Sequence, residues 1–459
     1  MAPGITKLSL NSLPTDLDFE DYISAHLLLG GYTLDRSIHE KVVGAGEIFE
    51  VDIISHKYTN TDEKRLIEIK SKKWDMNEVF KTGGRLRYLR IPTGAFIVQD
   101  KIDDKKFSAW QKSAPRMDIS LVYAGKNQAA DTDLDMTEFF NEFSMAGQVI
   151  DKSMLAATRY CYNAERCMRK QIAVLRKQHQ KEGIEALWDF SNAIQDISFF
   201  DDDPVSRLHE TFELFKKYNH ISARLDYEYL YGSFPDLNAC QAFEDGRVRG
   251  YMLNDIDYLP VNYSLYLEHR LRLYILQSCV EYLVMPKIYQ NQYDEFLKKL
   301  SYGALTSNIT LGIDFLATQC PNYKLYPRLW QIFTYMMGGI ILTDFWDKER
   351  DLLSNVSGVP INELDLAFSV YDILFPTSNK WIRTINGSHL MRLNLFSAPL
   401  MGIGANFRRC YYRDDDSEAG SSYEALEKKL SKDYTCLNLL KWNAAAFNLL
   451  KDAADLIKS

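Results

Sequence analysis

Hydrophobic and polar positions alternate in one way up to about residue 126 and in another way beyond it. In the first part, residues 47–55 (EIFEVDIIS) and 65–70 (RLIEIK) alternate with the two-residue period of a strand. They are also rich in β-branched residues, as half-buried strands are. Two further strands and an early additional one are expected at 94–99, 119–124 and 32–38.

Helical periodicity separates these strands. Helices are expected at 18–29, 75–89 and 103–112. Gly30-Gly31 ends the first helix, whereas Gly83-Gly84 weakens the second. A polar turn at 58–63 would join the first two strands into a hairpin. The order of elements predicts an α/β domain over residues 1–126.

Beyond a polar segment at 127–135, which is typical of a linker, the pattern is mostly helical. Helices are expected at 136–181, 205–218, 265–282, 293–300, 329–345 and 423–457. We therefore expect a large, mostly α-helical domain over residues 136–459, with a possible sub-boundary near residue 200. The apolar stretch 329–345 is too short and too polar to span a bilayer, so no membrane partner is expected.

Composition indicates the cellular compartment and shows how charge is distributed along the chain. The 459 residues hold 54 Lys and Arg against 62 Asp and Glu, and the seven cysteines follow no zinc or disulfide pattern. With no secretory signal at the start, a cytoplasmic protein is expected. Two stretches oppose the acidic balance: 64–116 has 14 basic and 6 acidic residues, and 152–181 has 8 basic residues and one acidic residue. A polyanion would be held locally in a groove.

Three charged residues of the predicted hairpin have a chemical interpretation. Asp52 lies on the first strand, and Glu68 and Lys70 share one face of the second. If the strands pair, two carboxylates and one ammonium converge. Hard cations such as Mg²⁺ prefer carboxylate oxygens and waters, and a metal-bound water loses its proton more easily. Lys70 would orient that water or stabilise charge on a phosphate, which suits phosphodiester hydrolysis.

Asp52 followed by Glu68-Ile69-Lys70 on the next strand resembles the PD-(D/E)xK nuclease superfamily, which has the restriction-endonuclease-like fold. Glu20, followed by LLLGGY, is similar to the helical Glu of Holliday-junction resolvases and Mrr-type enzymes. The resemblance covers about residues 18–125 and departs at Val51, where the motif has Pro. It implies that Asp52, Glu68 and Glu20 bind metal, and that Lys70 assists the attacking water. ExK alone is a weak motif, and the same alternation describes any half-solvated strand.

Basic residues flank this motif. Residues expected to contact phosphates after the motif are Lys72, Lys73, Lys81, Arg85, Arg87 and Arg90. On the helix around 159–181, one stripe of cations opposes one apolar stripe. The cations of the stripe are Arg159, Arg166, Lys170, Lys177 and Lys181. DNA backbone or an acidic surface of another subunit would suit them, and a plain solvated face is the alternative for both groups.

Together these features predict a Mg²⁺- or Mn²⁺-dependent deoxyribonuclease, an endonuclease that hydrolyses DNA. A nuclease joined to a helical domain resembles bacterial restriction or antiphage defence effectors, in which the helical domain would regulate cleavage as a homo-oligomer or through a regulatory partner protein. Two alternatives stay open. One is a non-catalytic nucleic-acid-binding or scaffold protein on the same fold, and the other is a ribonuclease.

Overall fold

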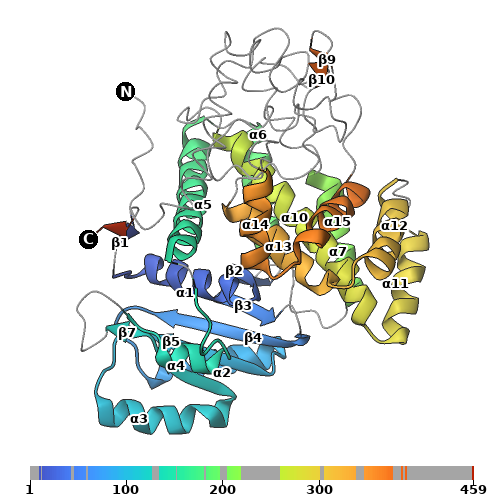
Figure 1. Cartoon of the computed structure of the whole chain (residues 1–459). Helices are drawn as coiled ribbons and strands as arrows, with labels where there is room; N and C mark the ends of the chain where they lie inside the picture. Colours follow the sequence, from blue (N-terminus) through green and yellow to red (C-terminus); the bar gives the residue numbers. More distant parts are fainter. Residues whose placement is uncertain are drawn as a thin grey trace. The chain divides into compact units, whose positions relative to one another are not determined.

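The computed structural model describes most of the chain up to residue 375 (Figure 1). The described residues are 10–11, 13–42, 46–57, 60–126, 134–150, 152–179, 182–196, 204–218, 259–299, 304–336, 346–375, 384–385, 388–389 and 457–458. The chain divides into two compact units. One is built mainly from Leu8–Asn163, and the other from Ala164–Ile197 and Asp203–Leu450. We refer to them as the sheet unit and the helical unit.

The sheet unit contains a mixed sheet of five strands in the order β2-β3-β4-β5-β6. Its strands are β2 (Tyr32–Val42), β3 (Gly46–Lys57), β4 (Asn60–Lys70), β5 (Thr93–Val98) and β6 (Ile119–Tyr123). The first three strands are antiparallel neighbours, whereas β4, β5 and β6 are parallel. Parallel neighbours need crossover connections, and helices provide both of them here.

Helices lie on both faces of this sheet. They are α1 (Leu17–Leu29), α2 (Met76–Leu89) and α3 (Asp104–Ser113). In Figure 1, α1 covers one face of the sheet and α2 and α3 lie on the other. Asp75 and Asp103 cap α2 and α3, because the Asp75 carboxylate accepts hydrogen bonds from two amides of the first turn and the Asp103 carboxylate accepts one. The caps explain where both helices begin.

The core between α2 and the sheet determines which strand residues face the site. Leu66 and Phe96 are fully buried there and form one cluster with Val79 and Leu86 of α2. Because side chains alternate along a strand, Glu68 lies on the same face as Leu66, toward α2. Burial of these large apolar side chains stabilises the layer by about 1.5–3 kcal/mol each.

Short elements complete the sheet unit. They are β1 (Leu10–Asn11), which pairs with β11 (Ile457–Lys458), the 3-10 helix Ala114–Met117, β7 (Gly125–Lys126), β8 (Leu134–Asp135) and α4 (Thr137–Glu142). On α4, Glu138 accepts hydrogen bonds from the Tyr123 amide and from Gln111. These bonds hold α4 beside the edge strand β6.

The described part of the helical unit is built from helices that bury large aromatic side chains. Beginning with α5, which starts in the sheet unit, the helices are α5 (Lys152–His179), α6 (Glu182–Asp196), α7 (Pro204–Tyr218), α10 (Leu259–Val284), α11 (Lys287–Lys299), α12 (Ala304–Gln319), the 3-10 helix Tyr323–Leu325, α13 (Tyr326–Met336), α14 (Trp346–Ser357) and α15 (Ile361–Leu374). Trp330 is fully buried and packs its ring against Phe368 and Tyr371 of α15. Two two-residue strands, Thr384–Ile385 and Ser388–His389, pair with each other.

The predicted fold class is confirmed at the level of an N-terminal mixed sheet with helices followed by a largely helical part. The predicted strands and helices up to residue 124 all occur, including the early strand, which extends to Val42. The predicted turn at 58–63 was too long, because β4 already begins at Asn60. The side chains at that end of β4 are polar, so the sequence pattern indicated a turn. Backbone hydrogen bonds form the strand there without apolar side chains.

The predicted single helix at 136–181 was wrong, because the chain leaves the helical conformation between α4 and α5. Ser144 and Gly147 both have positive φ there, a conformation that ends helices. Of the predicted linker, residues 127–133 lie outside the described residues, and 134–135 form β8. The part of 329–345 after Met336 and nearly all of 423–457 also lie outside them, as does the proposed sub-boundary near residue 200. Within the described ranges, no helix has the length and apolarity required to cross a bilayer.

Candidate active site

The candidate site lies where β3 separates from β4. The β3–β4 ladder ends at the pair Ile53↔Ile67, so residue 52 is no longer paired with β4. Instead, the Asp52 carboxylate accepts a hydrogen bond from the Ile69 amide, at 2.7 Å. A side chain thus replaces a backbone acceptor, and it satisfies an amide that the diverging strands would leave unpaired.

The strand on the other side of Asp52, β2, is also irregular in its backbone. The β2–β3 register passes from Arg36↔Ile53 to Ile38↔Val51, and Ser37 between them has φ of 50°. Positive φ costs energy for a residue with a side chain, and such residues are concentrated at functional sites. Both strands beside Asp52 therefore depart from regular geometry at this one position.

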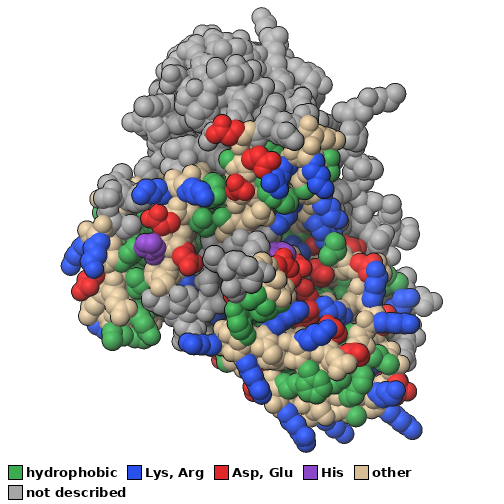
Figure 2. All heavy atoms as spheres, turned by 180° about the vertical axis from the view of Figure 1, so that it is seen from behind, with side chains coloured by type: hydrophobic (Ala, Val, Ile, Leu, Met, Phe, Trp, Pro, Cys, Tyr) green, Lys and Arg blue, Asp and Glu red, His purple; other side chains and the backbone are tan. Residues whose placement is uncertain are grey.

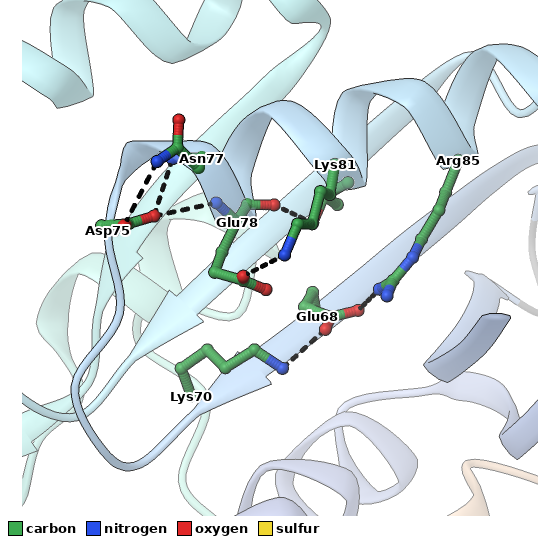
Figure 3. Close-up of polar contacts among 8 residues, drawn as sticks. Glu68, Lys70, Asp75, Asn77, Glu78, Lys81 and Arg85 are labelled. Carbon is green, nitrogen blue, oxygen red and sulfur yellow. Dashed lines mark hydrogen bonds and ion pairs between the residues drawn. The ribbon is translucent and has the colours of Figure 1, made fainter.

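Glu68 is held between two cations on the face toward α2. Its Oε1 accepts a hydrogen bond from Lys70 Nζ at 2.6 Å, and its Oε2 accepts one from Arg85 at 2.5 Å. Figure 3 shows Lys70 arriving along β4 and Arg85 from α2, on either side of the Glu68 carboxylate. Lys70 Nζ also lies 4.0 Å from Asp52 Oδ2. The expected convergence of Asp52, Glu68 and Lys70 is therefore present.

Burial makes this cluster electrostatically unusual. The Glu68 side chain is 4% exposed and that of Asp52 is 16% exposed. Burial, followed by repulsion from the Glu68 carboxylate, raises the pKa of Asp52 to about 7, although Lys70 and the Ile69 amide partly oppose the shift. Asp52 therefore changes its charge close to neutral pH.

Lys70 responds in the opposite sense. Burial alone would lower the pKa of its ammonium, but the charges of Glu68 and Asp52 and the hydrogen bond to Glu68 outweigh burial and raise the pKa. Lys70 therefore stays protonated at neutral pH. It provides a hydrogen-bond donor and a positive charge, not a base.

The donor set suits a hard divalent cation. Asp52 and Glu68 contribute carboxylate oxygens from adjacent strands, and Mg²⁺ commonly binds through one or two carboxylates while retaining several waters. The raised pKa of Asp52 agrees with this fit, because burial first and repulsion from the Glu68 carboxylate second both disfavour an ionised Asp52, and a bound cation would offset both effects. Within the described ranges, no group of three or more His, Cys, Asp and Glu side chains is arranged to hold a metal.

Glu20 lies on α1 and is half-buried. Since no such group of three includes it among the described residues, Glu20 does not complete a three-carboxylate cluster with Asp52 and Glu68 in this structure. Its role as a third ligand stays a prediction. Glu50, two residues before Asp52, is 49% exposed, and its carboxylate lies 3.9 Å from His39. Its charge is a minor cause of the raised pKa of Asp52.

The predicted phosphate-binding residues after the motif occupy different environments. Lys72 is 78% exposed and pairs with Asp16, and Lys81 is 63% exposed and pairs with Glu78. Lys73 and Arg87 are exposed, whereas Arg85 is turned inward to Glu68. On the face displayed in Figure 2, Lys and Arg side chains project from the sheet unit around hydrophobic patches. Phosphate binding by these residues stays a prediction.

The cationic stripe on α5 is not uniform. Arg159 is 1% exposed, because its guanidinium pairs with Asp18 of α1 at 3.1 Å and lies 5.1 Å from the Tyr22 ring centroid. Its inclusion in a solvent-facing stripe was wrong. Lys170 and Lys177 are exposed and Arg166 is half-exposed, whereas Lys181 lies outside the described residues.

The sequence pattern did not reveal that Arg85 holds Glu68. A positive residue seventeen positions after a strand residue is not a local signal, since the contact depends on how α2 packs on the sheet. Helical spacing does place Arg85 beside Lys81 and Glu78, on the side of α2 that borders Glu68 in Figure 3.

No protein-family model, curated protein or solved structure matches the chain. The geometry of the site is therefore the basis for inferring a function.

Proposed function

We propose that the chain is a metal-dependent endonuclease that hydrolyses phosphodiester bonds of DNA at Asp52, Glu68 and Lys70. The observation that supports this proposal is the meeting of two buried carboxylates and a protonated lysine where β3 and β4 diverge. The order of one helix, three antiparallel strands, a helix and a parallel strand agrees with the resemblance to PD-(D/E)xK nucleases. The helical unit would regulate cleavage.

In this proposal Asp52 and Glu68 would hold the metal, which would supply Lewis-acid stabilisation and a more acidic water. Lys70 remains protonated, so its Nζ orients the water by a hydrogen bond and stabilises negative charge that develops on the phosphate. Arg85 is a positioning residue. It fixes the Glu68 carboxylate by a direct hydrogen bond and, being an arginine, keeps its charge at every relevant pH.

Cleavage of supercoiled plasmid by the full chain tests the proposal. With Mg²⁺ or Mn²⁺ we expect nicking that Asp52→Asn and Lys70→Met each reduce by about 100-fold or more, the scale on which single charge-stabilising groups act. Glu47→Gln is the matched control, because this exposed carboxylate on the same strand pairs with His39 and should leave the rate unchanged. Parallel reactions with RNA distinguish a ribonuclease.

Nicking that persists unchanged in Asp52→Asn and Lys70→Met would contradict the proposal. If the wild-type chain binds DNA but cleaves no nucleic acid with either metal, a non-catalytic binding protein is the better description. One observation favours that second candidate: both Glu68 oxygens already have cationic partners within hydrogen-bond distance, so a metal must compete with Lys70 or Arg85.

A further inference from the structure

The solvent-facing side of α2 presents two aromatic rings close to the candidate site. Phe80 is 57% exposed and Tyr88 is 54% exposed. Gly84 lies midway between them on the same side, since residues four apart are neighbours on a helix. A Cβ added at Gly84 would meet no atom within 4 Å. The two rings therefore lie on either side of a glycine that has no side chain and no neighbouring atom over it.

Direct contacts connect one of these rings, that of Tyr88, to the site. The Tyr88 ring packs edge-on against Phe49 of β3, with 5.6 Å between the centroids. The guanidinium of Arg85, which binds Glu68, lies 5.6 Å from the same Phe49 ring. Tyr88 also donates a hydrogen bond from its hydroxyl to Glu40 at 3.1 Å. A ligand that reaches Glu68 and extends past Arg85 thus meets Phe49 and Tyr88 next.

Cations outnumber acidic residues along the segment that carries the two rings, although Glu40 of β2 accepts the Tyr88 hydroxyl. Between residues 72 and 90 the chain has six Lys and Arg but only two acidic residues. Arg87 and Arg90 are exposed, and neither has an ion-pair partner among the described residues. A purely apolar partner would leave these cations uncompensated, whereas a nucleic-acid strand supplies phosphates for the cations and flat bases for the rings.

We propose that this side of α2 binds unpaired nucleotides next to the bond that is cut, with bases stacked on Phe80 and Tyr88. The inference rests on the proposed nuclease function and specifies its substrate class as single-stranded or locally unpaired nucleic acid. In a duplex the base faces are covered by their neighbours, so only unpaired nucleotides offer a face to an exposed ring. Stacking on an aromatic side chain contributes about 1–3 kcal/mol per base, or about 5- to 150-fold in affinity.

Fluorescence anisotropy with the full chain tests the inference. A labelled single strand and a blunt duplex of the same sequence are titrated in EDTA, so that no cleavage occurs. We expect tighter binding of the single strand by the wild type. Phe80→Leu combined with Tyr88→Leu should weaken single-strand binding by at least 10-fold and leave duplex binding unchanged, because leucine keeps an apolar side chain but has no ring face.

The matched control is Phe80→Tyr combined with Tyr88→Phe, which keeps both rings, moves the hydroxyl from position 88 to position 80 and so removes the hydrogen bond to Glu40. It should bind the single strand like the wild type. Thermal unfolding of both double variants verifies that they fold. Equal affinity of the wild type for the two ligands, or wild-type affinity in the leucine variant, would overturn the inference.

The experiment separates this inference from the proposed function. Loss of single-strand preference with intact, Asp52-dependent cleavage would refute the inference alone. If single-strand binding depends on the rings but no cleavage occurs with Mg²⁺ or Mn²⁺, the nuclease proposal is refuted and the inferred binding surface on α2 still holds. A chain that binds no nucleic acid would refute both.

Discussion

Asp52 accepts the Ile69 amide at the point where β3 leaves β4, and this position explains both its burial and its raised pKa. An ionised carboxylate here loses solvation and lies near Glu68. The fold would be more stable with a neutral acceptor at this position. Residues that destabilise a fold in this way are concentrated at functional sites.

Asp52→Asn should therefore stabilise the chain at pH 8 while abolishing cleavage. The amide retains an oxygen for the Ile69 amide but removes the charge that burial and Glu68 oppose. The unfolding free energy, measured by urea titration, should rise by an amount on the order of a few kcal/mol, given about 1.36 kcal/mol per pKa unit. A variant less stable than the wild type at pH 8 would contradict the account.

The stability of the wild type relative to Asp52→Asn should depend on pH with a definite sign. Because the pKa of Asp52 rises on folding from 3.8 to about 7, the folded chain binds more protons than the unfolded chain between these values. The contribution of Asp52 to stability is fully present below pH 4 and is lost as the pH rises to about 7. His26 changes oppositely, since burial lowers its pKa to about 4. The difference between wild type and Asp52→Asn removes the contribution of His26.

At the scale of residues, the two-residue period of the strands was sufficient to place Asp52, Glu68 and Lys70 together. It was not sufficient to show that β3 and β4 separate at Asp52, because divergence depends on how the whole sheet twists. Arg85 was expected to face phosphate, and its inward contact with Glu68 depends on the packing of α2. Tertiary contacts of this kind leave no local pattern.

Among the elements, α5 is attached to α1 by a buried ion pair. Arg159 pairs with Asp18 and contacts Tyr22, while Tyr162 lies beneath the guanidinium of Arg36. Helical periodicity predicted that Arg159 belongs to a cationic stripe, because periodicity shows only which residues share one side of a helix. It cannot show that a residue has a buried acidic partner on another helix. The break between α4 and α5 was missed for a related reason, since positive φ at Ser144 has no strong sequence pattern.

Arg159→Leu should lower stability strongly. It leaves Asp18 partly buried without its counterion, and loss of one partner of a buried pair typically costs about 3–5 kcal/mol. Lys170→Leu, at an exposed position of the same helix, should change stability by less than about 0.5 kcal/mol. Midpoints of urea unfolding for both variants provide the measurement, and equal midpoints would contradict the buried-pair interpretation.

For the molecule as a whole, charge is distributed unevenly. The net charge is -8, yet residues 64–116 have a surplus of eight positive charges. Such a chain should bind DNA through a limited surface, with an affinity that falls as salt increases. Two stretches compete for this role, the one after the motif and the exposed cations of α5.

Two triple variants distinguish these stretches. Lys72→Gln, Lys73→Gln and Arg87→Gln together should lower the salt dependence of DNA binding by about one unit of slope for each phosphate that the variant no longer neutralises. Arg166→Gln, Lys170→Gln and Lys177→Gln together test α5 in the same assay. If only the α5 variant changes the slope, the surface beside the motif is not the DNA-binding surface.

Anomalous scattering from a crystal grown with Mn²⁺ would show whether Asp52 and Glu68 together bind a divalent metal. We predict one anomalous peak in contact with both carboxylates, at about the 2.0–2.1 Å at which Mg²⁺ binds oxygen, with Lys70 beside it. The peak should vanish in crystals of Asp52→Asn. A structure in which Lys70 and Arg85 still hold both Glu68 oxygens, with no peak at Asp52 under saturating Mn²⁺, would contradict the account.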